Sequence, residues 1–388
     1  MKTGFLMGLL ATAMVPVPAF ANAAATTTAA GEPSAFDRFA PATERRDHRL
    51  DWQHWDEALA WLVIPMGPSI RDGAPRVEPV VGSRIVYGHE SRYRLEGNRV
   101  ALSFVEPEIL GALSDYRADL ERIGSKLDLA RLPRNEQLAY WINLHNVAVI
   151  EALAKAYPLT DTAHLRFGEE QAGLHDAKLV RVKGVALSPR DIRERIVYPN
   201  WRDPKVIYGF WHGAIGSPSI QRMAYTGSNV DALLALSGEE FVNSLRGVEA
   251  WGGSLQVSPI YSEAAPFYFA DDAALHDHLR QFAADDVGKL LRKHRRVDYK
   301  RFDTDLADMA RGERDPSINN VRSQAGGLAA FEADITQPIP FRPNQAIMRL
   351  MTERAVKLAR AADQGIRTGM VIYGDNGYSP DDPVSEVE

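Results

Sequence analysis

The sequence of 388 residues contains no cysteine. This absence excludes disulfide bonds, thiolate metal sites, iron–sulfur clusters and any cysteine nucleophile. Basic residues number 45 against 51 acidic ones, and the net charge of −6 argues against a nucleic-acid partner, which needs a basic face to contact phosphates. The zinc HExxH motif, the P-loop, the GxSxG motif and the dinucleotide fingerprint are also missing from the sequence. We therefore expect no cofactor and no bound metal.

The first residues form a targeting pattern. Lys2 precedes an apolar run from Phe5 to Val15, and Ala19-Phe20-Ala21 is a small-x-small cleavage site. This order is typical of a secretory signal peptide over residues 1–21, cleaved after Ala21. A membrane anchor is the alternative, but the apolar run is shorter than the ~20 residues of a spanning helix. We expect a bacterial protein that is periplasmic or secreted, with no transmembrane segment after signal cleavage.

The rest of the chain divides by composition into three parts. Residues 22–45 are small and polar, which predicts a flexible leader. Residues 46–309 form the expected main domain. Residues 310–388 form a C-terminal extension, with one long helix over 344–363 and a frayed acidic tail over 379–388. Long helical patterns with short, scattered strands predict an α+β fold, mostly helical with a small β-sheet.

Turn and cap residues predict local elements in the middle of the chain. Residues 179–187 predict a hairpin with Lys183-Gly184 at its turn. Ser188-Pro189 predicts a helix start, with serine as N-cap and proline in the first turn. Ser217-Pro218 predicts a second helix start for the same reason. The apolar, β-rich run over 204–215 predicts a strand.

A helix predicted over residues 133–156 carries few charges and is expected to be buried on most sides. At about 100° per residue, Glu136, Asn143 and Asn146 fall on one stripe, while His145 points to nearly the opposite side. Each unpaired buried amide costs ~1–3 kcal/mol, so these side chains need partners. They either hold a neighbouring loop by hydrogen bonds or form one wall of a ligand pocket.

Four segments of the chain resemble, in order, the pattern of one family. The segments are LPRNEQLAYWINLHNVAVIEALAKAYP, VRVKGVALSPRDIRERIV, DPKVIYGFWHGAIGSPSIQRMAYTGSNVDALLALSGEEFV and VDYKRFDTDLAD. On these residues the chain is similar to the family catalogued as domain of unknown function 547, over residues 52–308. The function of this family is largely unassigned. The resemblance therefore implies which family the chain is similar to, but little about its reaction or ligand. Trp141 is retained from the pattern together with Asn143 and Asn146.

The departures from the family pattern fall in the third segment. The family's two cysteines align with His212 and Ser217, and its histidine aligns with Ile207. A cysteine at a helix start has a lowered pKa and suits a nucleophile, whereas a serine there needs a general base. His212 is the first candidate base and His145 the second. The alternatives are that Ser217 is a plain N-cap and that His212 is a buried, hydrogen-bonded residue.

The leading interpretation is an exported binding or cell-envelope protein of unassigned role, a degenerate relative of a cysteine-based enzyme fold. Its partner is a small molecule or an envelope component. The candidate binding residues are Glu136, Asn143, Asn146 and Trp141. The alternative is a hydrolase or acyl-transferase with Ser217 and His212 as catalytic residues. One basic cluster, KLLRKHRRVDYKR over 289–301, is either a solvated face or a site for acidic lipid or polymer.

Overall fold

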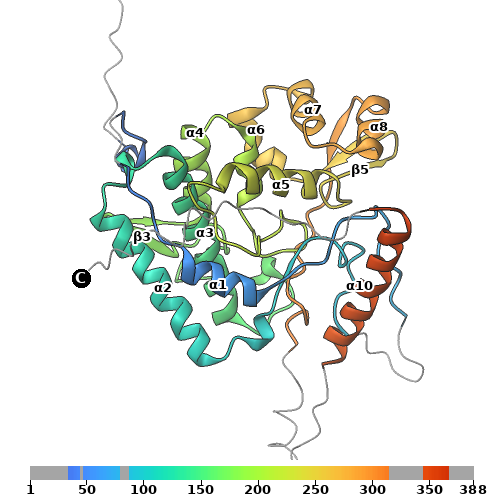
Figure 1. Ribbon diagram of the computed structural model, residues 1–388, viewed down its shortest axis with the longest axis horizontal. Coiled ribbons are helices and arrows are strands. Elements are labelled where there is room, and N and C mark those ends of the chain that lie inside the picture. Colours follow the sequence, from blue (N-terminus) through green and yellow to red (C-terminus); the bar gives the residue numbers. More distant parts are fainter. Residues whose placement is uncertain (1–33, 44–46, 79–86, 314–343, 367–388) are drawn as a thin grey trace, which may run out of the picture. The chain divides into compact units, whose positions relative to one another are not determined.

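Helices supply most of the regular structure in the computed structural model (Figure 1). The structure describes residues 34–43, 47–78, 87–313 and 344–366. Its α-helices are α1 (Gln53–Leu62), α2 (Pro107–Lys126), α3 (Arg134–Ala156), α4 (Tyr198–Asn200), α5 (Val230–Val242), α6 (Ile260–Tyr268), α7 (Asp272–Arg280), α8 (Asp285–Lys293) and α10 (Gln345–Asp363). Short 3-10 helices are η1 (Asp37–Phe39), η2 (Leu102–Phe104), η3 (Leu129–Arg131), η4 (Thr162–His164) and η6 (Pro204–Gly209), and η5 (Asp191–Val197) is π-helical. The predicted α+β class, mostly helical, is confirmed.

Several predicted segments lie outside the described residues. These are the signal peptide over 1–21, the acidic tail over 379–388 and most of the C-terminal extension before α10. The leader predicted over 22–45 is described only in part, and there Phe39 of η1 is buried. All named elements belong to the compact unit that begins at Phe36.

The helix α3 lies at the centre of the hydrophobic core. Every residue from Glu136 to Ala154 is buried, as expected for a helix with so few charges. The neighbouring helix α2 packs along it, and Tyr140 of α3 donates its hydroxyl to the carbonyl of Leu120 at 2.9 Å. Gly124 permits this approach, because a Cβ there would lie 2.0 Å from the Tyr140 hydroxyl oxygen.

The sheets of the described residues are small. They are β1 (Val63–Ile64) with β2 (Arg99–Val100), β3 (Val180–Val182) with β4 (Val185–Leu187), and β5 (Val248–Trp251) with β6 (Ser254–Val257) and β7 (Val297–Tyr299). All pairs are antiparallel except β6 with β7, which is parallel. The β3–β4 pair confirms the predicted hairpin, since Lys183 and Gly184 take φ angles of 47° and 80° at its turn. The β5–β7 sheet has no counterpart in the sequence-based expectation.

The helix after β4 starts where Ser188-Pro189 predicts. The Ser188 hydroxyl oxygen accepts from the Asp191 N–H at 3.1 Å, and the Asp191 carboxylate accepts from the Ser188 N–H at 2.8 Å. This reciprocal pair is a capping box, which satisfies two backbone donors of the first turn. The helix then continues through η5 and α4 to Asn200.

The predicted C-terminal helix is confirmed as α10, which packs on the loop before β2. Its N-cap Asn344 accepts from the backbone N–H groups of Ala346 and Ile347. Arg94 in the loop donates Nε and Nη2 to the two carboxylate oxygens of Glu353 on α10, at 2.7 and 2.9 Å. A bidentate pair of this kind fixes orientation as well as proximity.

Two elements predicted near the candidate residues are wrong. Residues 204–215 form η6 and an irregular segment instead of a strand. Asn146 of α3 holds the backbone at Gly209 and Trp211, and strand-like pairing is limited to an isolated bridge between Ala214 and Leu306. No helix starts at Ser217-Pro218, and the next α-helix is α5. Residues 230–242 form the single helix α5, and Gly238 within it lies against the ring of Tyr208.

Candidate functional site

Asn143 on the polar stripe of α3 holds one residue of a neighbouring segment. Its Nδ2 donates to the carbonyl of Tyr225 at 2.7 Å, and its Oδ1 accepts from the N–H of Tyr225 at 3.1 Å. The side chain is 1% exposed. Asn143 thus pairs with Tyr225 as a strand neighbour would, and both ends of its amide are satisfied inside the protein.

Asn146, one turn further along α3, does the same for a second segment. Its Nδ2 donates to the carbonyl of Gly209 and its Oδ1 accepts from the N–H of Trp211, both at 3.0 Å. These bonds hold the irregular chain that precedes His212. The two asparagines therefore form the hydrogen-bonded clamp that the sequence offered as one of two alternatives, and neither has an amide facing a pocket.

Glu136 and Trp141, the other two candidate binding residues, are also internal. Glu136 accepts from the backbone N–H of Leu50 at 3.4 Å, and burial raises the pKa of its carboxyl above the ordinary value. Trp141 is 1% exposed and packs edge-on against Phe39, with ring centroids 5.2 Å apart. The geometry gives Glu136 a loop-holding role and Trp141 a core-packing role.

Ser217 lies in a buried turn, not at a helix start. Its hydroxyl donates toward the carbonyl of Ala214 at 2.7 Å, with the carbonyl of Pro218 at 3.1 Å. The residue is 0% exposed. Within the part of the chain that the structure describes, its oxygen has no histidine partner, so the Ser217–His212 pairing needed for serine catalysis is not formed.

A buried ion pair lies beside α3, on the face occupied by His145. Arg193 of η5 donates Nε and Nη2 to the two carboxylate oxygens of Glu263 on α6, at 2.6 and 2.8 Å. Its Nη1 donates to His145 Nε2 at 3.0 Å. Because a guanidinium only donates, Nε2 accepts, and His145 Nδ1–H donates to Asn146 Oδ1 at 3.0 Å.

Two further histidines complete this arrangement. His175 Nδ1 lies 3.5 Å from Arg193 Nη1, and its Nε2–H donates to the carbonyl of His212 at 3.2 Å. The rings of His175 and His212 have centroids 4.8 Å apart. Neither ring nitrogen of His212 hydrogen-bonds another described residue. We call His145, His175, His212, Arg193 and Glu263 the histidine cluster.

The imidazoles of the histidine cluster are neutral at neutral pH. Burial, reinforced by the positive charge of Arg193, lowers the pKa of His145 and His212 well below the ordinary value. The same two causes lower the pKa of His175 to about 3. The cation of Arg193 is matched by Glu263, so the cluster offers hydrogen bonds without net charge. Among the described residues, no group of three or more histidine, cysteine, aspartate or glutamate side chains could hold a metal ion.

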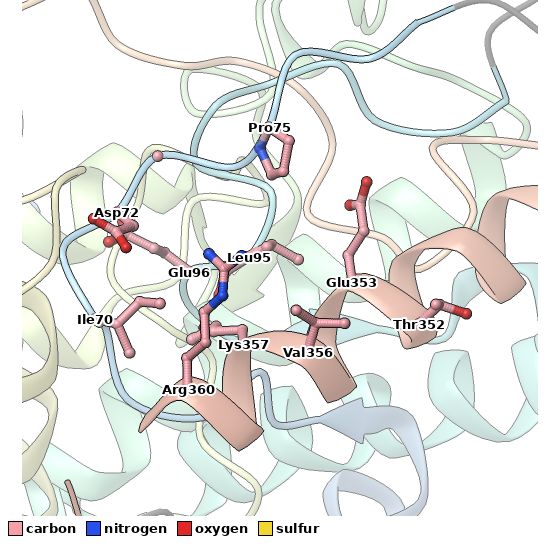
Figure 2. A pocket seen from close by; sticks show the side chains of 11 residues that line it. Ile70, Asp72, Pro75, Leu95, Glu96, Thr352, Glu353, Val356, Lys357 and Arg360 are labelled. Carbon is pink, nitrogen blue, oxygen red and sulfur yellow. The ribbon is translucent and has the colours of Figure 1, made fainter. Parts of the chain in front are cut away.

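A separate pocket of about 200 Å³ lies between α10 and the loop that precedes β2 (Figure 2). Ile70, Leu95 and Val356 give it apolar walls. Lys357, at its base, is 3% exposed and donates to three backbone carbonyls, those of Met66, Gly67 and Leu95. Burial lowers the pKa of Lys357 to about 8. This lysine closes the pocket by joining helix to loop.

The charged groups lining this pocket differ in whether they have protein partners. The Glu353 carboxylate accepts hydrogen bonds from Arg94, and the Glu96 carboxylate accepts from the backbone N–H groups of Leu245 and Arg246. Asp72 and Arg360 are exposed, and no side-chain hydrogen bond or ion pair joins either of them to another described residue. Figure 2 shows Arg360 extending from α10 and Asp72 on the facing loop. These two groups are available to a ligand.

The sequence did not indicate the histidine cluster as a unit or the pocket. The sequence pattern indicates His145 only as a second candidate base, and it does not indicate His175, Arg193 or Glu263. Arg193 lies 48 residues from His145 and 70 from Glu263, a separation at which no local pattern exists. None of the described helices is long and apolar enough to cross a membrane.

The fold and site define a mostly helical α+β protein with a buried, uncharged histidine cluster and a small pocket beneath its last described helix. The family model described as "Protein of unknown function, DUF547" matches residues 129–242, so this part of the chain is similar to that family. The resemblance is confirmed there, over the first three of its four segments, and the fourth segment, 297–308, lies outside the matched residues. Comparisons with curated proteins and with solved structures gave no match.

Proposed function

We propose that this protein is an exported, cell-envelope-associated binding protein, and that its ligand occupies the pocket between α10 and the loop before β2. The observation that carries the binding proposal is the pair of charged groups on this pocket, Arg360 and Asp72, neither of which has a partner among the described residues. Pockets with apolar walls and a few convergent polar groups are the usual form of small-ligand sites.

The pocket indicates the chemistry of the ligand. Its volume of about 200 Å³ is below the ~300–1,000 Å³ of drug-sized sites, so the ligand has the size of a single amino acid. Arg360 suits a carboxylate, Asp72 suits an ammonium group, and Ile70, Leu95 and Val356 suit a branched apolar body. A small zwitterion or organic acid fits these three requirements.

Serine catalysis has less support. A serine nucleophile needs a base within hydrogen-bond reach, and the Ser217 hydroxyl is directed to backbone carbonyls. The first candidate base, His212, contacts the other histidines of the cluster. A binding role without turnover agrees with this arrangement.

Calorimetric titration with three probes of the same branched body tests the binding proposal. The probes are leucine, isovalerate and isoamylamine, which carry both charged groups, the carboxylate alone and the ammonium alone. We expect leucine to bind, Arg360→Ala to abolish binding of the two carboxylates, leucine and isovalerate, and Asp72→Ala to weaken the two amines, leucine and isoamylamine, but not isovalerate. Arg122→Ala is the matched control, since Arg122 is a 55% exposed arginine on α2. No heat with any probe, or equal binding by Arg360→Ala, would contradict the proposal.

Cell fractionation with N-terminal sequencing tests the export proposal independently. The pattern Ala19-Phe20-Ala21 supports cleavage that leaves Asn22 as the first residue. We expect the protein in the periplasmic or extracellular fraction with that N-terminus. Recovery of the uncleaved chain from the cytoplasm would overturn export and leave the pocket proposal standing.

A further inference from the structure

The hairpin between β5 and β6 presents a tryptophan at its tip. Trp251 pairs with Ser254 across the turn, and the side chain of Trp251 is 76% exposed. Gly252 and Gly253 form the turn with φ angles of 58° and 85°, and a Cβ on either would meet no atom within 4 Å. The Ser254 hydroxyl donates to the Trp251 carbonyl at 3.1 Å, which closes the turn. A large indole is therefore held in solvent on a well-defined turn, without a packing role.

Basic side chains lie beside this tip. His294 Nδ1 contacts the carbonyl of Gly253 at 3.0 Å, and the N–H of Leu255 donates to the carbonyl of Arg296 at 2.9 Å. These bonds join the end of α8 and the start of β7 to the hairpin, and Figure 1 shows α8 next to β5. The neighbouring exposed basic residues are Arg292, Lys293, Arg295 and Arg296. We call these four residues and Trp251 the tip patch.

The tip patch has a charge of opposite sign to the whole chain. Residues 289–296 contain five lysines and arginines and no acidic residue, within a chain of net charge −6. Arg296 pairs with Asp298, and Lys289 outside the patch pairs with Asp286. Arg292, Lys293 and Arg295 have no ion pair within the described residues. Three cations are therefore available next to one exposed indole.

We propose that the tip patch docks this protein on an anionic membrane surface, with Trp251 in the lipid headgroup region. An indole with an apolar body and a polar N–H is suited to that region. Each lysine or arginine near an anionic leaflet strengthens binding about fivefold. The negative charge elsewhere on the chain is repelled by the same surface, which directs the tip patch toward the lipid. This inference rests on the proposed envelope association and names the surface and the chemistry that would provide it.

Cosedimentation with lipid vesicles tests the proposal on the purified chain from Asn22 onward. One set of vesicles is phosphatidylcholine alone, and the other contains about one third phosphatidylglycerol. We expect binding only to the anionic vesicles, and weaker binding at high salt because exposed charges are screened. A variant with Arg292, Lys293 and Arg295 all changed to glutamine should bind about 100-fold more weakly. Trp251→Ala should also weaken binding, without loss of thermal stability, because the side chain makes no core contact.

Matched controls separate the tip patch from general exposure. Trp61 is 50% exposed on α1, so Trp61→Ala removes another exposed indole. Arg122→Gln with Lys126→Gln removes two basic side chains on α2. Both controls should bind vesicles as the unchanged chain does.

Several results would overturn the membrane proposal. These are equal binding to both vesicle types, no binding to either, or the same loss in the controls. Binding to a polyanion such as heparin without vesicle binding would also overturn it and assign the patch to a soluble acidic polymer. The vesicle assay uses purified protein without pocket ligand, so its failure would leave the export and calorimetric results unaffected.

Discussion

Replacing Asn143 by alanine should lower the free energy of unfolding by about 2–4 kcal/mol, since both backbone groups of Tyr225 lose their partner. Each buried unpaired group costs ~1–3 kcal/mol, and a water entering the small space left by the amide offsets part of the sum. The measurement is equilibrium urea unfolding, extrapolated to water. Asn200→Ala is the control, because Asn200 is only half-buried and makes one side-chain bond, to the carbonyl of Ile196 at 2.8 Å. We expect it to cost less than about 1 kcal/mol.

A second variant separates hydrogen bonding from loss of volume. Asn143→Asp keeps the size of the side chain and the acceptor for the Tyr225 N–H, but replaces the donor to the Tyr225 carbonyl with a carboxylate oxygen. Burial disfavours the charged form, so acid restores a hydroxyl donor. The variant should therefore be strongly destabilised at neutral pH and regain part of its stability, relative to the unchanged chain, in mild acid. A cost below about 1 kcal/mol for Asn143→Ala, or an Asn143→Asp deficit that does not change with pH, would refute the clamp.

Three further predictions concern the buried polar groups. Glu263→Gln should lower the free energy of unfolding in urea by about 3–5 kcal/mol, because it leaves the buried charge of Arg193 unmatched. The control Asp277→Asn breaks an exposed ion pair and should lower it by less than about 1 kcal/mol. Equal losses in the two variants would contradict this prediction. The histidine cluster should make stability fall as pH drops from about 6.5 toward 3, because the unfolded state then binds protons that the folded state excludes. The free energy of unfolding should change by up to about 1.4 kcal/mol per pH unit for each histidine. His175→Asn should make this pH dependence shallower, and an unchanged pH dependence would count against a neutral His175. Ser217→Ala should cost about 0.5–1.5 kcal/mol in urea unfolding and leave calorimetric ligand binding unaltered, and loss of binding would place Ser217 in the site.

The parts of the fold that depend on neighbours in sequence were predictable. The spacing of apolar residues predicted α3 and α10. Lys183-Gly184 predicted the β3–β4 turn, and Ser188-Pro189 predicted the capped helix that follows. In each case the groups that satisfy one another lie within a few residues, so local chemistry decides the outcome.

The same reasoning failed at Ser217-Pro218, where an identical dipeptide does not start a helix. At Ser188 the partner is Asp191, three residues away. Around Ser217 the chain is held by distant groups, since the N–H of Gly216 donates to the carbonyl of Asp303 and Arg246 donates to the Ser217 carbonyl. A dipeptide carries no information about such partners, and their hydrogen bonds outweigh the local preference for a helix.

By itself, the sequence determined the absence of thiol chemistry, the confirmed family resemblance and the polar stripe of α3 with its demand for hydrogen-bond partners. Only the tertiary structure decided what those partners are. It brought Tyr225 to Asn143, Arg193 to His145 and Glu263, and the loop before β2 to α10. The physical reason is that a buried polar group needs a hydrogen-bond partner, but its own chemistry does not determine which atom that partner is. The choice depends on which backbone and side chains the packing of distant segments places within about 3 Å.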